Sequence, residues 1–220
     1  MRFTTSLLAA GFLSPSLAAP TSSNAATSIS SSALSARNST SGSFKWFGAN
    51  ESGAEFGSGN IPGVLGTDFE WPSTSAIQIL MDKGMNTFRI PHQMERLAQG
   101  AMAASLDATY LSEYQTVINY ITKAGGYAII DAHNFGRYGG SIVTSASDMH
   151  TYWQNVATEF ATNDNVIFDC MNEFHDEPST ELVVSLNQAC INGVRAAGAT
   201  SQYIFVEGTV SCPHFSLSSF

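Results

Sequence analysis

Five short apolar runs alternate with longer stretches of helical periodicity, and this rhythm leaves few folds open to the chain. Each run has the length of a β-strand and lacks the polar alternation of a strand with one face in water. Continuous apolar runs of this kind predict a parallel sheet, which is covered on both faces. The runs span residues 45–49, 87–90, 127–131, 166–171 and 203–206.

The stretches between the runs begin and end with helix signals. Serine, threonine or aspartate precedes each stretch and can accept a hydrogen bond from a free amide of the first helical turn. The expected N-terminal caps are, in order, Ser73 or Thr74, Asp107, Ser147, and Ser179 or Thr180. We expect the third helix to cover residues 148–160, while Gly84 and Gly198 end the first and the fourth.

Strands that alternate with helices form either an open doubly wound sheet or a closed (β/α)8 barrel. An open nucleotide-binding sheet would carry Gly-x-Gly-x-x-Gly between its first strand and first helix. Here Gly57, Gly59 and Gly63 surround a proline in a loop and open no helix. The pattern therefore disfavours the nucleotide-binding fold.

The charge balance disfavours two classes of partner. The chain has 18 acidic and 9 basic residues, a formal net charge of −9. Nucleic acids and anionic membranes are bound mainly through lysine and arginine, so we expect neither as a partner. A neutral polymer such as a polysaccharide fits this charge, and we expect a monomer that binds one.

The first 43 residues are expected to lie outside the folded domain. Residues 1–19 combine Arg2, an apolar stretch and small residues, as a secretory signal peptide does. Residues 20–43 are rich in Ser and Thr with few large apolar side chains, which predicts a disordered linker or pro-segment. The domains are therefore a signal peptide, this linker, a folded part at 44–208 and an atypical tail at 209–220. We expect the protein to be secreted.

Three cysteines, Cys170, Cys190 and Cys212, predict one disulfide and one remaining thiol, with the pairing open. There is neither Cys-x-x-Cys nor His-Glu-x-x-His in the sequence, so we expect no metal and no cofactor.

Polar residues follow all five apolar runs. In a parallel barrel the carboxyl ends of the strands form one rim, where active sites are built. The candidate site residues are Asn50, Arg89, His133, Asn134, Asn172, Glu173 and Glu207.

Glu173 is the candidate general acid, since glycosidic cleavage requires a carboxylic acid that protonates the leaving oxygen. Arg89 can orient a neighbouring carboxylate and keep it ionised. We expect Asn172, His133 and Asn134 to contact substrate. Four aromatic residues could stack on sugar faces or belong to the core, and the sequence leaves this open. They are Trp46, Trp71, Phe135 and Tyr138.

Five ordered motifs resemble fungal endo-β-1,4-glucanases of glycoside hydrolase family 5. They are Gly-Ala-Asn-Glu-Ser-Gly-Ala-Glu-Phe at 48–56, Phe-Arg-Ile-Pro at 88–91, Asp-Ala-His-Asn at 131–134, Asn-Glu-Phe-His-Asp at 172–176 and Gly-Ala-Thr-Ser-Gln-Tyr-Ile-Phe-Val-Glu-Gly at 198–208. The resemblance implies an α/β (β/α)8 TIM barrel and retaining hydrolysis of internal β-1,4 bonds without metal or cofactor. It also implies that Glu173 is the acid/base, with Arg89, His133 and Asn172 beside it.

The chain departs from the family in two respects. Phe174 stands where the family usually has proline, which affects a loop rather than the chemistry. The family's nucleophilic glutamate lies on the seventh strand, whereas only about the first five βα units are expected here. We therefore expect a shortened family member with no nucleophile in this chain; Glu207 is a poor replacement. Two alternatives stay open, a β-mannanase or other β-glycan hydrolase on the same barrel and a non-catalytic sugar-binding remnant.

The first prediction concerns the 220-residue product expressed alone. An incomplete barrel has unpaired strand edges and exposed apolar surface, so the product is expected to aggregate and to hydrolyse carboxymethylcellulose poorly or not at all. Reducing-sugar release by the purified chain is the measurement. Turnover that Glu173→Gln abolishes would contradict the prediction.

Overall fold

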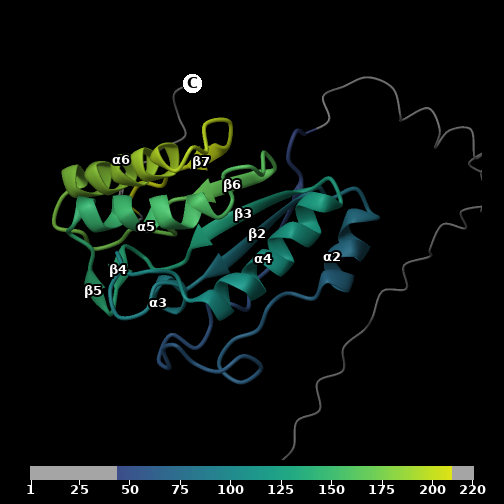
Figure 1. Cartoon of the computed structure of the whole chain (residues 1–220), viewed down its shortest axis with the longest axis horizontal. Coiled ribbons are helices and arrows are strands. Elements are labelled where there is room, and N and C mark those ends of the chain that lie inside the picture. Colours follow the sequence, from purple (N-terminus) through teal and green to yellow (C-terminus); the bar gives the residue numbers. More distant parts are fainter. Residues whose placement is uncertain (1–43, 210–220) are drawn as a thin grey trace, which may run out of the picture. The chain divides into compact units, whose positions relative to one another are not determined.

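A five-stranded parallel sheet is the framework of the computed structural model, which describes residues 44–209 (Figure 1). The strands lie side by side in the order of the sequence, as in the consecutive βα units of a barrel and unlike the rearranged order of a doubly wound sheet. They are β1 (Gly48–Asn50), β2 (Thr87–His92), β3 (Tyr127–Ala132), β6 (Val166–Asp169) and β7 (Tyr203–Phe205). The predicted parallel sheet is confirmed. The predicted signal peptide, linker and tail beyond residue 209 lie outside the described residues.

Helices connect the strands, and their caps follow the sequence at three of four places. They are α2 (Thr74–Met81), α3 (Met94–Leu97), α4 (Ala108–Lys123), α5 (Ala146–Thr158) and α6 (Thr180–Ala196). Ser73, Asp107 and Ser179 cap α2, α4 and α6 as expected. The predicted start of the third helix at Ser147 is wrong, because Ser145 accepts the hydrogen bond of the first turn and α5 begins at Ala146.

Two short elements were not predicted. Helix α3 follows β2 directly, and the antiparallel pair β4 (Arg137–Tyr138) and β5 (Ser141–Ile142) lies between β3 and α5. Both lie after the carboxyl end of a strand, in connections that border the predicted rim (Figure 1).

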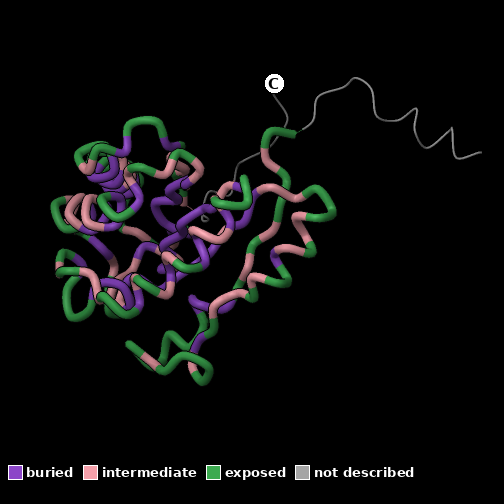
Figure 2. Tube along the Cα trace, turned by 45° about the vertical axis from the view of Figure 1, so that its right-hand side comes forward, coloured by how far each residue is buried: buried purple, intermediate pink, exposed green. Residues whose placement is uncertain are grey.

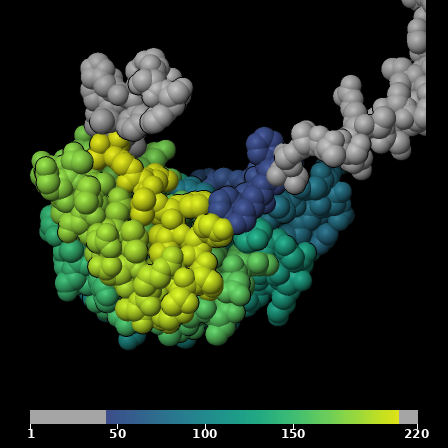
Figure 3. Space-filling model, turned by 90° about the horizontal axis from the view of Figure 1, so that it is seen from above, coloured from purple at the N-terminus to yellow at the C-terminus, as the bar shows by residue number. Residues whose placement is uncertain are grey.

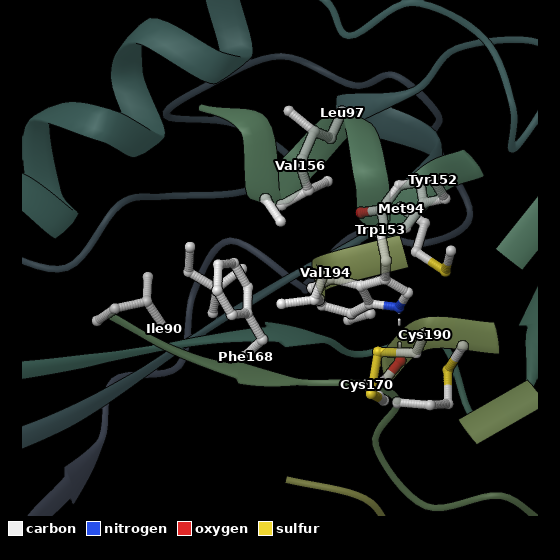
Figure 4. Close-up of a cluster of buried hydrophobic side chains, with 14 of the residues drawn as sticks. Ile90, Met94, Leu97, Tyr152, Trp153, Val156, Phe168, Cys170, Cys190 and Val194 are labelled. Carbon is white, nitrogen blue, oxygen red and sulfur yellow. Dashed lines mark hydrogen bonds between the residues drawn. A yellow bond between two sulfur atoms is a disulfide. The ribbon is translucent and has the colours of Figure 1, made fainter. Parts of the chain in front are cut away.

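One face of the sheet packs against the helices and forms the main core. Side chains alternate along a strand between its two faces. Ile90, Phe168 and the residues two positions from each of them therefore point to the helix-covered face. Figure 4 shows these two residues beside Trp153 and Val194 of the covering helices α5 and α6. Figure 2 shows burial along the trace, where the central strands β2, β3 and β6 are mostly buried and the edge strands are more exposed.

The opposite face of the sheet is concave. Trp46, which precedes β1, has its ring centroid 4.8 Å from that of Tyr203 and 5.8 Å from that of Phe205, both on β7. A flat sheet of five strands would separate its edges by roughly 19 Å, farther than a tryptophan reaches. The sheet therefore curves as a barrel does, and Figure 3 shows the segment around β1 (purple) beside β7 (yellow). Trp46 fills this interior and does not lie at the rim.

A disulfide between Cys170 and Cys190 joins the residue after β6 to helix α6. Both cysteines are fully buried. This settles the pairing that the sequence left open and excludes Cys170 as a free thiol; Cys212 lies outside the described residues. The crosslink closes a loop of 20 residues at the end of the strand that leads to Glu173.

The second prediction concerns this crosslink. The double variant Cys170→Ala/Cys190→Ala is expected to lose about 3 kcal/mol of unfolding free energy, because a loop of this length no longer restricts the unfolded chain. Urea unfolding measures the loss, and Cys212→Ser, which leaves the crosslink intact, is the control. A loss below about 1 kcal/mol would contradict the prediction.

Candidate active site

Arg89, on β2, lies at the centre of the rim, and its guanidinium contacts four polar side chains from the ends of three other strands. Nε lies 2.9 Å from Asp169 Oδ2, and Nη2 lies 3.0 Å from Asp131 Oδ2. Nη2 also donates to Asn172 Oδ1 at 2.9 Å, and Nη1 donates to Asn50 Oδ1 at 3.1 Å. Arg89 therefore brings the predicted residues Asn50 and Asn172 together, and it also binds Asp131 and Asp169, which were not among the candidate site residues.

Two aspartates beneath the rim share this one cation. Asp131 and Asp169 are partners in the register of β3 and β6, so they project from the same face of neighbouring strands. Both are buried, and the Oδ1 atom of each has no hydrogen-bond partner in the described structure. Burial and the charge of Asp131 raise the pKa of Asp169 to about 7 against the opposing effect of Arg89. Burial also raises the pKa of Asp131, while His133 and Arg89 oppose the rise.

Arg89 stays charged in this setting. Burial alone would lower its pKa, but Asp131 and Asp169 raise it. Asp169 was missed by the sequence reasoning because it lies inside an apolar run. Its signal was the strand period, which places residue 169 on the face that also carries Asp131 and Arg89.

His133 is fixed by a neighbour two positions back. Its Nδ1 lies 2.7 Å from Asp131 Oδ2, and its side chain is partly exposed. This contact fixes the orientation of the ring and leaves Nε2 as the nitrogen available to a ligand.

Glu173 is exposed and follows directly after Asn172. Its own backbone N–H donates to Glu207 Oε2 at 2.7 Å, and Glu207 Oε1 lies 3.8 Å from Arg89 Nη2. The structure thus places the backbone of Glu173 beside Glu207, and Glu207 lies near Arg89. Glu207 is bonded to the protein's own donors, an arrangement that suits support of the loop better than attack on a substrate.

Asn134 is placed differently from the other candidates. It is 5% exposed, its Oδ1 accepts from Met94 N at 2.8 Å, and its Nδ2 donates to Glu95 Oε2 at 2.7 Å. The amide is therefore bonded to helix α3 rather than free for substrate. His92 is likewise buried, with Nε2 2.6 Å from Tyr152 Oη, and burial lowers its pKa to about 3.

The three remaining aromatic candidates lie in different environments, and one of them is at the rim. Trp71 stacks on Tyr114 at 5.1 Å and donates to Glu113, so it belongs partly to the core. The Tyr138 hydroxyl donates to a backbone carbonyl. Phe135 lies at the rim, where its ring centroid is 5.2 Å from that of His133.

The comparisons with known proteins agree with this geometry. The family model described as Cellulase (glycosyl hydrolase family 5) matches residues 48–214. The chain belongs to glycosyl hydrolase family 5. Solved structures of the family resemble it in fold: XacCel5A in complex with cellopentaose superposes with a TM-score of 0.71 at 32% identity, covering 76% of this chain and 53% of that one. The predicted α/β barrel, present here in part, is thereby confirmed.

Fungal relatives in this family are closer in sequence. Endo-beta-1,4-glucanase B of Emericella nidulans is 60% identical over 165 residues, covering 75% of this chain and 50% of the relative. Endoglucanase gh5-1 of Neurospora crassa is 52% identical over 168 residues, covering 76% of this chain and 43% of the relative. The chain thus spans about half the length of the curated family 5 proteins that it matches.

The third prediction follows from the raised pKa of Asp169. A carboxyl group whose pKa is higher in the folded than in the unfolded state stabilises the fold when protonated, and this stabilisation is lost as the pH rises from about 4 through about 7. Asp169→Asn removes that dependence and retains an acceptor for Arg89. The unfolding free energy of the variant minus that of the unmodified chain is therefore expected to rise by about 2 kcal/mol from pH 5 to pH 8.

Urea unfolding at both pH values measures this difference. Asp82→Asn, on the surface after α2, controls for the general effect of removing a carboxylate. An equal difference between Asp169→Asn and the unmodified chain at both pH values would contradict the prediction.

Proposed function

We propose that the protein carrying this chain is a secreted, retaining endo-β-1,4-glucanase that hydrolyses internal bonds of cellulose or related β-glucans. The observation that carries the proposal is the cluster of Arg89, Asn172 and Glu207 at the carboxyl ends of the strands, because Glu173 follows Asn172 directly and its backbone N–H donates to Glu207. The endo-beta-1,4-glucanase names of its relatives support the same activity.

In the proposed mechanism Glu173 protonates the oxygen of the departing sugar and then acts as the base that activates water. Arg89 occupies Asn172 Oδ1, so Nδ2 is the group of this amide that would donate to a substrate hydroxyl. His133 offers Nε2 to the same ligand because Asp131 occupies Nδ1. We assign the nucleophile to no residue of this sequence.

Two features support secretion. Residues 1–19 have the composition of a signal peptide. The Cys170–Cys190 disulfide fits an oxidising compartment. Within residues 44–209, no helix has the length and apolar character that crossing a bilayer requires. We propose that the protein acts as a monomer on a neutral glycan, and that it uses neither metal nor cofactor.

The fourth prediction tests this function in a complete barrel. Residues 44–208 are fused to the part of Emericella nidulans endo-beta-1,4-glucanase B that follows its matched region, since that relative is 60% identical over the match. The chimera is expected to hydrolyse carboxymethylcellulose. Glu173→Gln should lower kcat by about 10²- to 10⁴-fold, because the leaving oxygen loses its proton donor.

Mannan assayed in parallel separates a β-mannanase from a glucanase. Affinity electrophoresis in both polymers separates binding from turnover, and Glu70→Gln, outside the rim cluster, is the matched control. A folded chimera that releases sugar equally well with and without Glu173→Gln would overturn the assignment of Glu173.

A further inference from the structure

The loop that carries Glu173 has an unfavourable backbone. Glu173 has φ +48° and Asp176 has φ +60°, and both are residues with a Cβ in the left-handed region. Such conformations cost free energy and persist only where the surroundings enforce them. The contacts that enforce this loop therefore also determine where its carboxyl group is presented.

We propose that Arg137 is a positioning residue for Glu173, and that it acts as a pair with the buried carboxylate of Glu177. This inference rests on the function proposed above for Glu173. Arg137 does not touch the rim cluster around Arg89; it would act through the backbone of the loop.

Arg137 joins two loops that are far apart in the sequence. Its Nη1 donates to His175 O at 2.8 Å, in the middle of the Glu173 loop, and to Phe135 O in the loop after β3. Phe135 lies between the two loops as well, with its ring centroid 5.8 Å from that of His175. One guanidinium thus fixes the connection bearing His133 to the connection bearing Glu173.

Glu177 holds Arg137 in this position. The Glu177 side chain is 0% exposed, and neither of its oxygens has a hydrogen-bond partner within the described residues. Its compensating charge is Arg137, whose Nη1 lies 3.7 Å from Oε1. A buried carboxylate without a counter-charge is strongly unfavourable, so the pair resists separation. Asp176 lies 4.0 Å away from the same guanidinium but is largely exposed and adds little.

The backbone next to Arg137 allows this close approach. A Cβ on Gly136 would lie 2.2 Å from Glu177 Oε1 and 2.9 Å from a ring carbon of Phe174, so only glycine fits. The position also has φ +73°, which glycine adopts without strain.

The hairpin that bears Arg137 is itself anchored to helix α3. Glu95 Oε1 accepts from Gly139 N at 2.6 Å, and the Tyr138 hydroxyl donates to Ala98 O at 2.5 Å. Arg137 therefore presents its guanidinium from a fixed base, as a positioning residue requires.

Hydrogen exchange followed by mass spectrometry tests the proposal on the chimera with a complete barrel, which contains residues 44–208 of this chain, and needs no turnover. Arg137→Gln is expected to speed exchange of the amides in 173–177 about tenfold, because the loop loses its charged donor and Glu177 its counter-charge. Arg137→Lys, which retains the charge with a different donor geometry, is expected to restore part of the protection. The matched control is Arg195→Gln, since Arg195 also binds backbone carbonyls, at Ala199 and Gln202.

Unchanged exchange in 173–177 for Arg137→Gln would overturn the proposal. So would a similar increase in these amides for Arg195→Gln, or no rescue by lysine, because the effect would then be general loosening. A chimera in which Glu173→Gln leaves turnover intact would overturn the function of Glu173 separately, since the exchange measurement does not depend on it. In the active chimera, Arg137→Gln should lower kcat more than it changes KM.

Discussion

The guanidinium of Arg89 is the interaction on which the rim depends. It is one cation among the side chains of Asn50, Asp131, Asp169 and Asn172, which come from the ends or the following turns of three other strands. Removing it would take the guanidinium away from two buried aspartates, and the pKa values of both would rise further, because Arg89 favours their ionised forms. A planar group with five fixed donors suits this task, whereas lysine would place a single point charge there.

The two faces of the sheet differ in composition, because one face packs against helices and the other is concave. The face toward the helices is apolar except for His92 and forms the core, while the concave face changes from Trp46 and Ile129 to charged residues near the carboxyl ends. The charged residues are buried by the curvature of the sheet. The same curvature therefore excludes water beneath the rim and raises the pKa of Asp169.

Much of the fold was readable from the sequence because its signals are local. Each helix cap accepts a hydrogen bond within the first turn of its own helix, as at Ser73, Asp107 and Ser179. The apolar runs indicate strands that are buried on both faces of the sheet. The start of α5 was misjudged by two residues because Ser145 and Ser147 are equivalent in composition and differ only in which one accepts the first-turn bond. Helix α3 and the β4–β5 hairpin have too few residues for a periodic pattern.

The sequence predicts candidate site residues from their position, but it does not predict the contacts that each of them makes. Position at a strand end identified Arg89, Asn172 and Glu173, since parallel strands share one rim. Asn134 forms hydrogen bonds with Met94 and Glu95 of helix α3, about forty positions away in the sequence. No local sequence pattern predicts such a long-range contact.

The contact between the two edges of the sheet has a consequence for biosynthesis. Lys45 and Tyr203 touch although 158 positions separate them, and Trp46 lies between the same two edges. On the ribosome, the chain can pair its first four strands as they emerge, but the concave interior closes only after Tyr203 has left the exit tunnel. Until then Trp46 can pack on Tyr127 of β3 but lacks its contacts with Tyr203 and Phe205, so the nascent chain exposes more aromatic surface than the five-stranded sheet does.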